Sequence, residues 1–328
     1  MPVLSVKDLR MYYTTMAGDV KAVDGLDFEV EESEVLGIVG ESGCGKSSLS
    51  LALMKLLPSN AKIIGGQILV DGLDLVSASD AEVRRRIRWR KIAMIPQGAM
   101  NALNPVFRVG DQIVESITAH ADSSKGEAQK RTADLLKLVG IDPSRARYYP
   151  HEFSGGMKQR SMIAMSLSLT PSVLIADEPT TALDVIVQAG IVQLLLAIKK
   201  ELGTAIILIS HDLSLVAQMS DKVAIMYAGK FAEYGSSVAV YKTPLHPYTL
   251  GLLGAFADIR KPKEALISIP GSPPDLVNPP TGCRFHPRCP YAQQVCIDKE
   301  PEFEEALPGH MVSCHLWREI QRSRGVKG

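Results

Sequence analysis

A glycine-rich stretch near the N-terminus carries the clearest chemistry in the sequence. It reads Gly40-x-x-x-x-Gly45-Lys46-Ser47 and follows an apolar run at residues 35–39. Glycines let the backbone curl so that successive N–H groups face phosphate oxygens, and a helix that starts there adds the positive end of its dipole. The Lys46 ammonium would reach the β- and γ-phosphates, and the Ser47 hydroxyl would bind Mg²⁺. We therefore predict a phosphate-binding loop. The alternative, a plain glycine turn, is disfavoured by the strand before it and the helix after it.

Polar side chains also follow other apolar runs. Asp177 and Glu178 come directly after one buried run, His211 follows another, and Gln97 follows a third, shorter one. Because the carboxyl ends of strands in an open α/β sheet form its binding sites, we expect these side chains to meet the phosphate loop around one nucleotide. The alternative is ordinary: a carboxylate pair can cap a helix, and a loop histidine can be merely well hydrogen-bonded.

The chemistry of phosphoryl transfer suggests a role for each of these groups. Asp177 would hold Mg²⁺ through water, together with Ser47. Glu178 would orient or deprotonate the attacking water. His211 would contact the γ-phosphate or support the Glu178 side of the site, and Gln97 would sense the metal and the water.

The rest of the chain predicts the elements that position these residues. Residues 3–39 alternate like strands, residues 98–165 have helical spacing and are interpreted as a helical insertion, and the chain becomes proline-rich after residue 240. We predict an α/β fold with an N-terminal antiparallel β subdomain. The predicted domains are an ATPase domain at 1–240 and a loop-rich C-terminal extension at 241–328.

Composition limits the class of protein. The chain has 328 residues, with 36 Lys and Arg balanced by 36 Asp and Glu. A net charge of zero argues against a nucleic-acid partner. No apolar run approaches the roughly 20 residues that cross a bilayer, and no signal pattern opens the chain. We expect a protein of the cytosol, or one held at a membrane by a partner.

Four of the five cysteines fall close together, as Cys283-x5-Cys289-x6-Cys296-x17-Cys314. In a reducing compartment such a group favours a metal over disulfides. The spacing lacks the paired C-x2-C of a zinc ribbon, and four thiolates are the usual ligands of a [4Fe–4S] cluster. We predict a [4Fe–4S] cluster, with Zn²⁺ and unligated thiols as the alternatives.

Taken together, the motifs resemble those of the ATPase subunits of ABC transporters. The phosphate loop is GESGCGKS, Gln97 matches the Q-loop, VLIADE precedes a D-loop at Ala182-Leu183-Asp184, and His211 matches the switch histidine. The signature LSGGQ appears as FSGGM at 153–157, and Tyr13 matches the aromatic residue that stacks on adenine. The resemblance implies a P-loop NTPase fold. The implied nucleotide contacts are Tyr13, Gly40, Ser42, Gly43, Cys44, Gly45, Lys46, Ser47, Ser48, Asp177, Ser154, Gly155, Gly156 and Asp184. The implied catalytic residues are Glu178, His211 and Gln97, with Ser47 and Gln97 at the Mg²⁺.

The resemblance further implies a dimer that sandwiches ATP. Ser154, Gly155 and Gly156 would then act on the nucleotide of the partner subunit. Met157 replaces the usual glutamine of the signature and Phe153 the usual leucine, but the Ser-Gly-Gly core is intact.

Other stretches are similar to the ATPases of dipeptide/oligopeptide importers: MNALNP, YPHEFSGGMKQR, ADEPTTALD and HPYTLGLL, followed by a proline-rich tail with cysteines. Some importer subunits of this kind carry an iron–sulfur cluster in the tail. The implied partners are a second, related ATPase, two membrane permeases and an external solute-binding protein. The implied location is the cytoplasmic face of the membrane. A soluble ABC ATPase of DNA repair or translation and a non-catalytic subunit are the alternatives, and the cargo stays open among dipeptides, oligopeptides, oligosaccharides and nickel chelates.

Overall fold

A computed structural model of the chain describes residues 2–254 and 269–323. Eight strands form its central sheet: β3 (Val35–Val39), β6 (Ile92–Ile95), β7 (Val173–Asp177), β8 (Ala205–Ser210), β9 (Lys222–Tyr227), β10 (Lys230–Ser236), β11 (Glu304–Leu307) and β12 (His310–Val312). Their order is β11-β12-β10-β9-β3-β8-β7-β6. Strand β3 is parallel to both of its neighbours, and β6, β7 and β8 are parallel to one another. The predicted buried strands therefore lie side by side.

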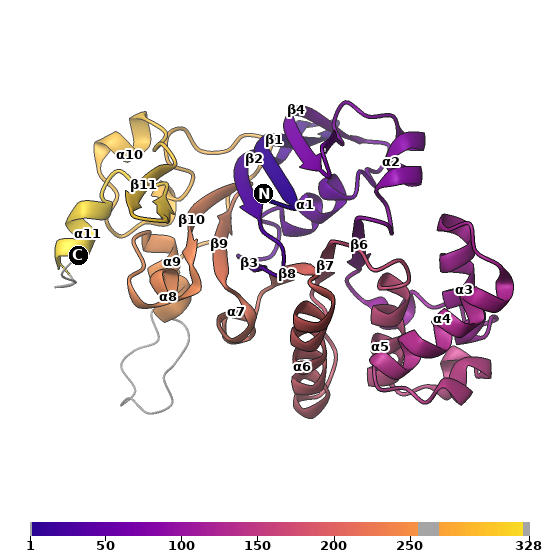
Figure 1. Cartoon of the computed structure of the whole chain (residues 1–328). Coiled ribbons are helices and arrows are strands. Elements are labelled where there is room, and N and C mark those ends of the chain that lie inside the picture. The colour runs from indigo at the N-terminus through magenta and orange to yellow at the C-terminus, as the bar shows by residue number, and fades with distance from the viewer. Residues whose placement is uncertain (1, 255–268, 324–328) are drawn as a thin grey trace.

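A second, antiparallel sheet is built from the N-terminal part of the chain. Its strands are β1 (Leu4–Thr15), β2 (Gly18–Val30), β4 (Ala61–Val70) and β5 (Leu73–Asp74), in the order β2-β1-β4-β5. This sheet is the one predicted from the alternating residues of this region. The two sheets together confirm the predicted α/β fold with an N-terminal antiparallel part (Figure 1).

Side chains on the two faces of the central sheet enter two different cores. Val35 and Val39 of β3 belong to a core shared with the helices, whereas Leu36 and Ile38 belong to a core shared with the antiparallel sheet. Strand β8 alternates in the same way. Strands that are covered on both faces need apolar residues at every position, which explains why they appear in the sequence as unbroken apolar runs.

Helices surround the sheets, and one group of them stands apart. The helices are α1 (Lys46–Leu53), α2 (Asp80–Arg86), α3 (Val109–His120), α4 (Lys125–Leu138), α5 (Gly155–Ser166), α6 (Val185–Leu202), α7 (Leu213–Met219), α8 (Ser237–Lys242), α9 (Pro247–Gly254), α10 (Gln294–Asp298) and α11 (Trp317–Ser323). Short 3-10 helices occur at Ala99–Asn101, Pro143–Arg147, Pro150–Glu152 and His286–Arg288. Figure 1 shows α3, α4 and α5 together at one end of the molecule, beyond β6. These three helices come from the stretch interpreted as a helical insertion.

Residues 269–323, called here the C-terminal module, continue the central sheet. Strand β12 pairs antiparallel with β10, through Glu233 opposite Val312 and Tyr234 opposite Met311, and β11 pairs with β12. The module is mostly loops, as predicted, but no sequence pattern indicated these two strands. They are three and four residues long, and the edge of β10 supplies their hydrogen-bond partners.

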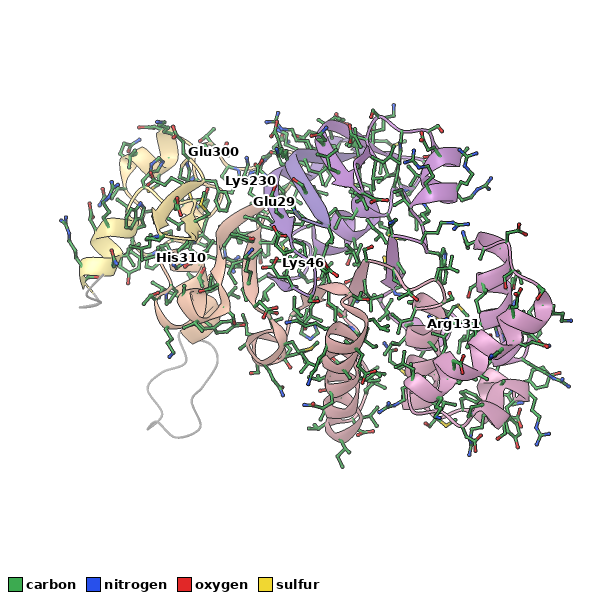
Figure 2. The ribbon with its side chains drawn as sticks, in the orientation of Figure 1. Glu29, Lys46, Arg131, Lys230, Glu300 and His310 are labelled. Atoms are coloured by element: carbon green, nitrogen blue, oxygen red, sulfur yellow. The ribbon has the colours of Figure 1, made fainter. Side chains whose placement is uncertain are left out.

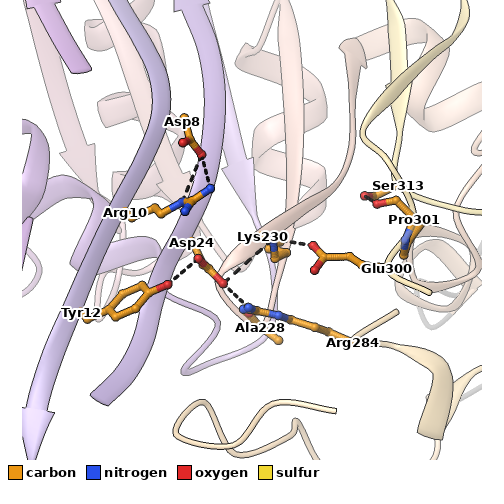
Figure 3. Close-up of polar contacts among 10 residues, drawn as sticks. All are labelled: Asp8, Arg10, Tyr12, Asp24, Ala228, Lys230, Arg284, Glu300, Pro301 and Ser313. Atoms are coloured by element: carbon orange, nitrogen blue, oxygen red, sulfur yellow. Dashed lines mark hydrogen bonds and ion pairs between the residues drawn. The ribbon is translucent and has the colours of Figure 1, made fainter. Parts of the chain in front are cut away.

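The C-terminal module also contacts the antiparallel sheet (Figure 3). Arg284 donates to the Asp24 carboxylate and to the Ala228 carbonyl, and the Tyr12 hydroxyl donates to the same carboxylate at 2.6 Å. Burial alone would raise the pKa of Asp24, but the hydrogen bond from Tyr12 and the charge of Arg284 outweigh it and lower that pKa. Lys230 lies between the carboxylates of Asp24 and Glu300. Arg284 of the C-terminal module is therefore bound to Asp24 of β2.

Candidate functional site

The glycine-rich loop packs tightly between two strands. A Cβ atom on Gly40 would lie 2.1 Å from the Met226 carbonyl oxygen, and one on Gly45 would lie 2.0 Å from the Ala22 carbonyl oxygen. Gly45 also has φ +111° and caps the N-terminus of α1. Both positions therefore require glycine, because a side chain would collide with backbone or strain it. The loop ends where α1 offers its N-terminal N–H groups to an anion.

Lys46 lies in the middle of the molecule, next to the strands of the central sheet (Figure 2). Its ammonium donates to the carbonyl oxygens of Gly40 at 2.7 Å and Glu41 at 2.9 Å. The Cys44 sulfur, which is buried, lies 3.6 Å from the same nitrogen, and burial raises the pKa of this thiol. The carbonyl groups of the loop thus hold the Lys46 ammonium in place.

A cavity of about 490 Å³ opens beside this loop. It is lined by Tyr13, Val20, Ala22, Ser42, Gly43, Gly45, Lys46, Ser47, Ser48, Gln97, Glu178, His211 and Leu276. Ten of the predicted site residues therefore line one cavity, namely Tyr13, the loop residues Ser42, Gly43, Gly45, Lys46, Ser47 and Ser48, and the strand-end residues Gln97, Glu178 and His211. The predicted convergence of loop and strand ends is what the structure has.

Asp177 ends β7 beneath the cavity and is 2% exposed. One carboxylate oxygen accepts a hydrogen bond from the Ser50 hydroxyl at 3.3 Å, and the other has no hydrogen-bond partner among the described residues. Burial raises the pKa of Asp177 despite the neighbouring hydroxyls of Ser47 and Ser50, which favour its charged form. A buried oxygen without a partner beside a serine hydroxyl is a donor set that suits Mg²⁺, which prefers oxygen ligands. These residues fit the predicted metal.

Glu178 takes an unusual backbone conformation for its residue type. Its φ is +49°, in the left-handed region that costs a non-glycine residue about 1–3 kcal/mol. Its backbone N–H donates to the Ile209 carbonyl of β8 at 2.8 Å, which holds the residue there. Strain of this kind is characteristic of functional sites, because the surrounding structure must impose it.

Three side chains hydrogen-bond to the Glu178 carboxylate. Gln97 Nε2 lies 3.2 Å away, Thr181 Oγ1 lies 3.0 Å away, and His211 Nδ1 lies 3.1 Å away. Burial alone would raise the pKa of Glu178, but the hydrogen bonds from His211 and Thr181 outweigh it and lower that pKa. The carboxylate is therefore ionised at neutral pH and can accept a hydrogen bond from a water in the cavity.

The signature residues and Asp184 lie outside this cavity. Ser154 caps α5, accepting from the Met157 N–H at 3.3 Å, and a Cβ on Gly156 would lie 2.7 Å from Val187. Asp184 caps α6 by accepting from the Val187 N–H at 2.9 Å. Within one chain these residues do not meet the nucleotide cavity. Their predicted role toward a partner's nucleotide stays a prediction.

Sequence analysis missed two residues of the C-terminal module that reach the loop and its cavity. Leu276 lines the cavity. Arg288 forms two hydrogen bonds with the carboxylate of Glu41, which is part of the phosphate loop, at 2.6 and 3.0 Å. More than 200 residues separate Arg288 from Glu41 in the sequence, and no local pattern marks either contact.

The prediction of a [4Fe–4S] cluster is wrong, and so is its zinc alternative. Cys283, Cys289, Cys296 and Cys314 are all free thiols and line a cavity of only about 10 Å³. No group of three or more His, Cys, Asp or Glu side chains in residues 2–254 and 269–323 could hold a metal ion. Burial raises the pKa of Cys283 to about 11 and that of Cys314 to about 12, so these free thiols are protonated at neutral pH.

The four cysteines instead pack with apolar side chains. Cys296 forms a small cluster with Leu316 and Ile320, against which Cys283 and Cys314 pack. Buried cysteine commonly behaves as a small apolar residue. The four cysteines, whose spacing suggested a metal cluster, therefore contribute to apolar packing instead.

No helix within the described ranges has the length and apolar character needed to cross a membrane.

Comparisons with known proteins match both parts of the chain. The family model "ABC transporter" matches residues 23–181, and the model "Oligopeptide/dipeptide transporter, C-terminal region" matches residues 232–296. The oligopeptide transport ATP-binding protein OppD of Escherichia coli (strain K12) is 48% identical over 313 residues, which cover 95% of this chain and 92% of that protein. The dipeptide transport ATP-binding protein DppD of Bacillus subtilis (strain 168) is 48% identical over 324 residues, covering 98% of this chain and 96% of that protein.

A solved structure is also similar to this chain. It is a dimeric ATP-binding cassette in a post-hydrolysis state with ADP and phosphate bound. Its TM-score is 0.64 at 25% identity, and the match covers 71% of this chain and 98% of that one.

Proposed function

The chain belongs to the ATP-binding subunits of oligopeptide and dipeptide ABC transporters, and on that premise we propose that it hydrolyses ATP to energise the import of peptides. The relatives favour this function over that of a soluble ABC ATPase in DNA repair or translation. The observation that carries the hydrolytic role is the ionised Glu178 carboxylate, held in a strained conformation at the edge of the cavity.

The triphosphate would lie against the loop and Lys46. The N–H groups at the start of α1 and the Lys46 ammonium would bind phosphate oxygens. Ser47 and the free oxygen of Asp177 would hold Mg²⁺, which when bound neutralises charge on the phosphates. Tyr13 would face the base, since it lines the same cavity. What supports this assignment is that Tyr13, Lys46 and Ser47 share one cavity, and that Asp177 directly precedes Glu178, which lines the same cavity.

Glu178 would orient the attacking water and accept its proton. Gln97 and His211 hold the carboxylate from two sides, at 3.2 and 3.1 Å, and so fix the direction of its free lone pairs. Positioning and charge stabilisation are the main contributions that a protein makes to phosphoryl transfer. In this proposal His211 and Gln97 position Glu178 rather than exchange protons themselves.

A second ATPase subunit would complete the site. Ser154, Gly155 and Gly156 stand at the N-terminal end of α5, outside this chain's own cavity, and would face a partner's nucleotide together with Asp184. The dimeric state of the similar cassette supports this arrangement. We further propose that the partner is a related ATPase, that two permeases and an external solute-binding protein complete the importer, and that the chain lies on the cytoplasmic face of the membrane. An ATPase domain at 1–240, with a helical part at 98–165, and an extension at 241–328 is the proposed division.

The proposal is tested with the variant Lys46→Ala in a strain that lacks the native subunit. We expect loss of ATP binding by the purified chain and loss of labelled-peptide uptake by the cells, with the protein still expressed and folded. Lys62→Ala is a matched control, because Lys62 is an exposed lysine of β4 that does not line the cavity. Uptake that persists at the wild-type rate in Lys46→Ala cells would contradict the proposed function.

A further inference from the structure

The segment around Leu276 brings the C-terminal module into the wall of the nucleotide cavity. Leu276 lines the cavity together with Tyr13, Val20 and Ala22 of the antiparallel sheet. The motifs of an ATPase subunit account for Tyr13 and for the phosphate loop beside it, but not for a residue more than 200 positions further along the chain.

The position of Leu276 is fixed by contacts on both sides of it. The Lys21 N–H of β2 donates to the Leu276 carbonyl at 3.0 Å, so the segment hydrogen-bonds to the strand that carries Val20 and Ala22. The next residue, Val277, packs on Gly18, where a Cβ would lie only 2.9 Å from its methyl group. The Val277 N–H in turn donates to the Asp275 carboxylate at 2.9 Å. The segment is thus held to the first turn of the antiparallel sheet.

Arg288 fixes the start of the same segment to the phosphate loop. Its guanidinium donates to the Pro270 carbonyl at 2.7 Å and to the Gly271 carbonyl at 3.3 Å, in addition to the two bonds to Glu41. The Arg288 side chain is 6% exposed. Five donors in a rigid plane suit such a junction of three chain segments. The Arg288 side chain therefore joins the segment that contains Leu276 to the phosphate loop.

The cavity has an apolar part and a polar part. Tyr13 lies opposite Val20 in the register of β1 and β2, and Leu276 is bonded to the neighbouring Lys21, so these apolar side chains are grouped together. The polar part is formed by Lys46, Ser47, Gln97, Glu178 and His211. A nucleotide has the same division, with a flat base and ribose at one end and the charged phosphates at the other.

From this arrangement we propose that Leu276 is a nucleotide-binding residue, whose side chain packs against the base or ribose of ATP and makes the C-terminal module part of the ATP site. The inference rests on the proposed function, because it takes ATP as the ligand. It adds to that function a contact between Leu276 and the end of the nucleotide that carries the base and ribose.

The test compares two ligands that share a phosphate chain. Calorimetry with Mg²⁺ present measures binding of ATP and of inorganic tripolyphosphate to the full chain and to Leu276→Ala. Removing three buried carbons from an apolar contact weakens ATP binding by about threefold to tenfold, while tripolyphosphate, which has no base or ribose, binds as it does to the wild type within about twofold.

A matched truncation controls for a general loss of packing. Leu202→Ala removes the same atoms from a partly buried leucine at the end of α6 that packs on the same core, and Leu202 does not line the cavity. We expect this variant to bind both ligands like the wild type. Equal losses for both ligands in Leu276→Ala, or no loss for either, would overturn the inference. A wild-type chain that binds neither ligand would overturn the proposed function as well.

Discussion

Two Glu–His pairs occur in the part of the chain that the structure describes, and they have different surroundings. Glu178 and His211 are 3.1 Å apart at the carboxyl ends of β7 and β8, where the His211 side chain is 66% exposed. Glu233 and His310 are 2.7 Å apart between β10 and β12, where the side chains are 0% and 1% exposed. Figure 2 shows His310 on the side of the C-terminal module and Lys46, next to the first pair, in the middle of the molecule.

The difference lies in what each carboxylate has left to bind. Glu233 accepts from the backbone N–H groups of Leu245 at 2.8 Å and His246 at 2.9 Å as well as from His310, and its side chain is fully buried. Glu178 also accepts three hydrogen bonds, but it borders the nucleotide cavity and its backbone is strained. The Glu233–His310 pair therefore joins two chain segments, whereas the Glu178–His211 pair borders the cavity in which the nucleotide would bind.

The largest expected effect concerns the exposed pair. Glu178→Gln keeps the size of the side chain and one acceptor oxygen but removes its charge and its capacity to accept a proton. We expect phosphate release to fall about a thousandfold, within the range for loss of a general base. ATP affinity and the unfolding temperature should stay at their wild-type values, since no buried charge is left unpaired.

Rates come from a coupled phosphate assay and affinities from calorimetry, on the purified variant and the wild type. A variant that releases phosphate at the wild-type rate would show that Glu178 is not the catalytic carboxylate. A variant that loses both hydrolysis rate and stability would show that Glu178, like Glu233, has a structural role, and the distinction between the two pairs would not hold.

The buried pair should respond in the opposite way. Glu233→Ala leaves two backbone N–H groups and a histidine nitrogen buried without their acceptor. Breaking a buried pair by removing one partner costs about 3–5 kcal/mol, so we expect the free energy of unfolding to fall by that amount. Equilibrium urea unfolding measures the change. The control is Glu302→Ala, whose side chain is 83% exposed, with an expected change below about 0.5 kcal/mol. A loss below 1 kcal/mol in Glu233→Ala would contradict the fastening role.

The sequence was informative where a local pattern determines the structure. The loop from Gly40 to Ser47 has fixed spacing, and Glu178 and His211 come within two residues of the ends of unbroken apolar runs, so a rule about strand ends was enough to bring them together. The strained backbone of Glu178 could not be predicted, because a hydrogen bond to Ile209 of another strand imposes it.

Contacts between distant segments were not predictable in the same way. Leu276 and Arg288 lie in a proline-rich stretch without periodicity, and their partners Lys21 and Glu41 are set only by how the C-terminal module packs on the sheets. The cysteines show the converse error. Their spacing is compatible with a metal site, but the choice between ligation and packing depends on burial, which the spacing does not report.

The smallest expected effect is a pH dependence that comes from the buried region. His246 donates its backbone N–H to Glu233, and its Nδ1 accepts from the Tyr248 N–H at 3.0 Å, so the folded imidazole is held neutral. Burial lowers the pKa of His246 to about 3, only partly offset by a hydrogen bond with the Ser313 backbone. In the unfolded chain the same group has its ordinary pKa of about 6.5. Between pH 6.5 and 3 the unfolded chain therefore binds a proton that the folded chain does not.

Stability must then fall as the pH falls through this window. The slope approaches about 1.4 kcal/mol per pH unit, and the loss from pH 7 to pH 5 is about 2 kcal/mol from this group alone. Urea unfolding of the wild type and of His246→Asn at both pH values isolates the contribution of His246 to this loss. The asparagine does not titrate, and its side-chain oxygen can still accept the hydrogen bond from the Tyr248 N–H. We expect the wild type to lose about 2 kcal/mol more than the variant over this interval. Equal losses in both proteins would mean that His246 takes up a proton in the folded chain, and would contradict the neutral, buried imidazole on which this prediction rests.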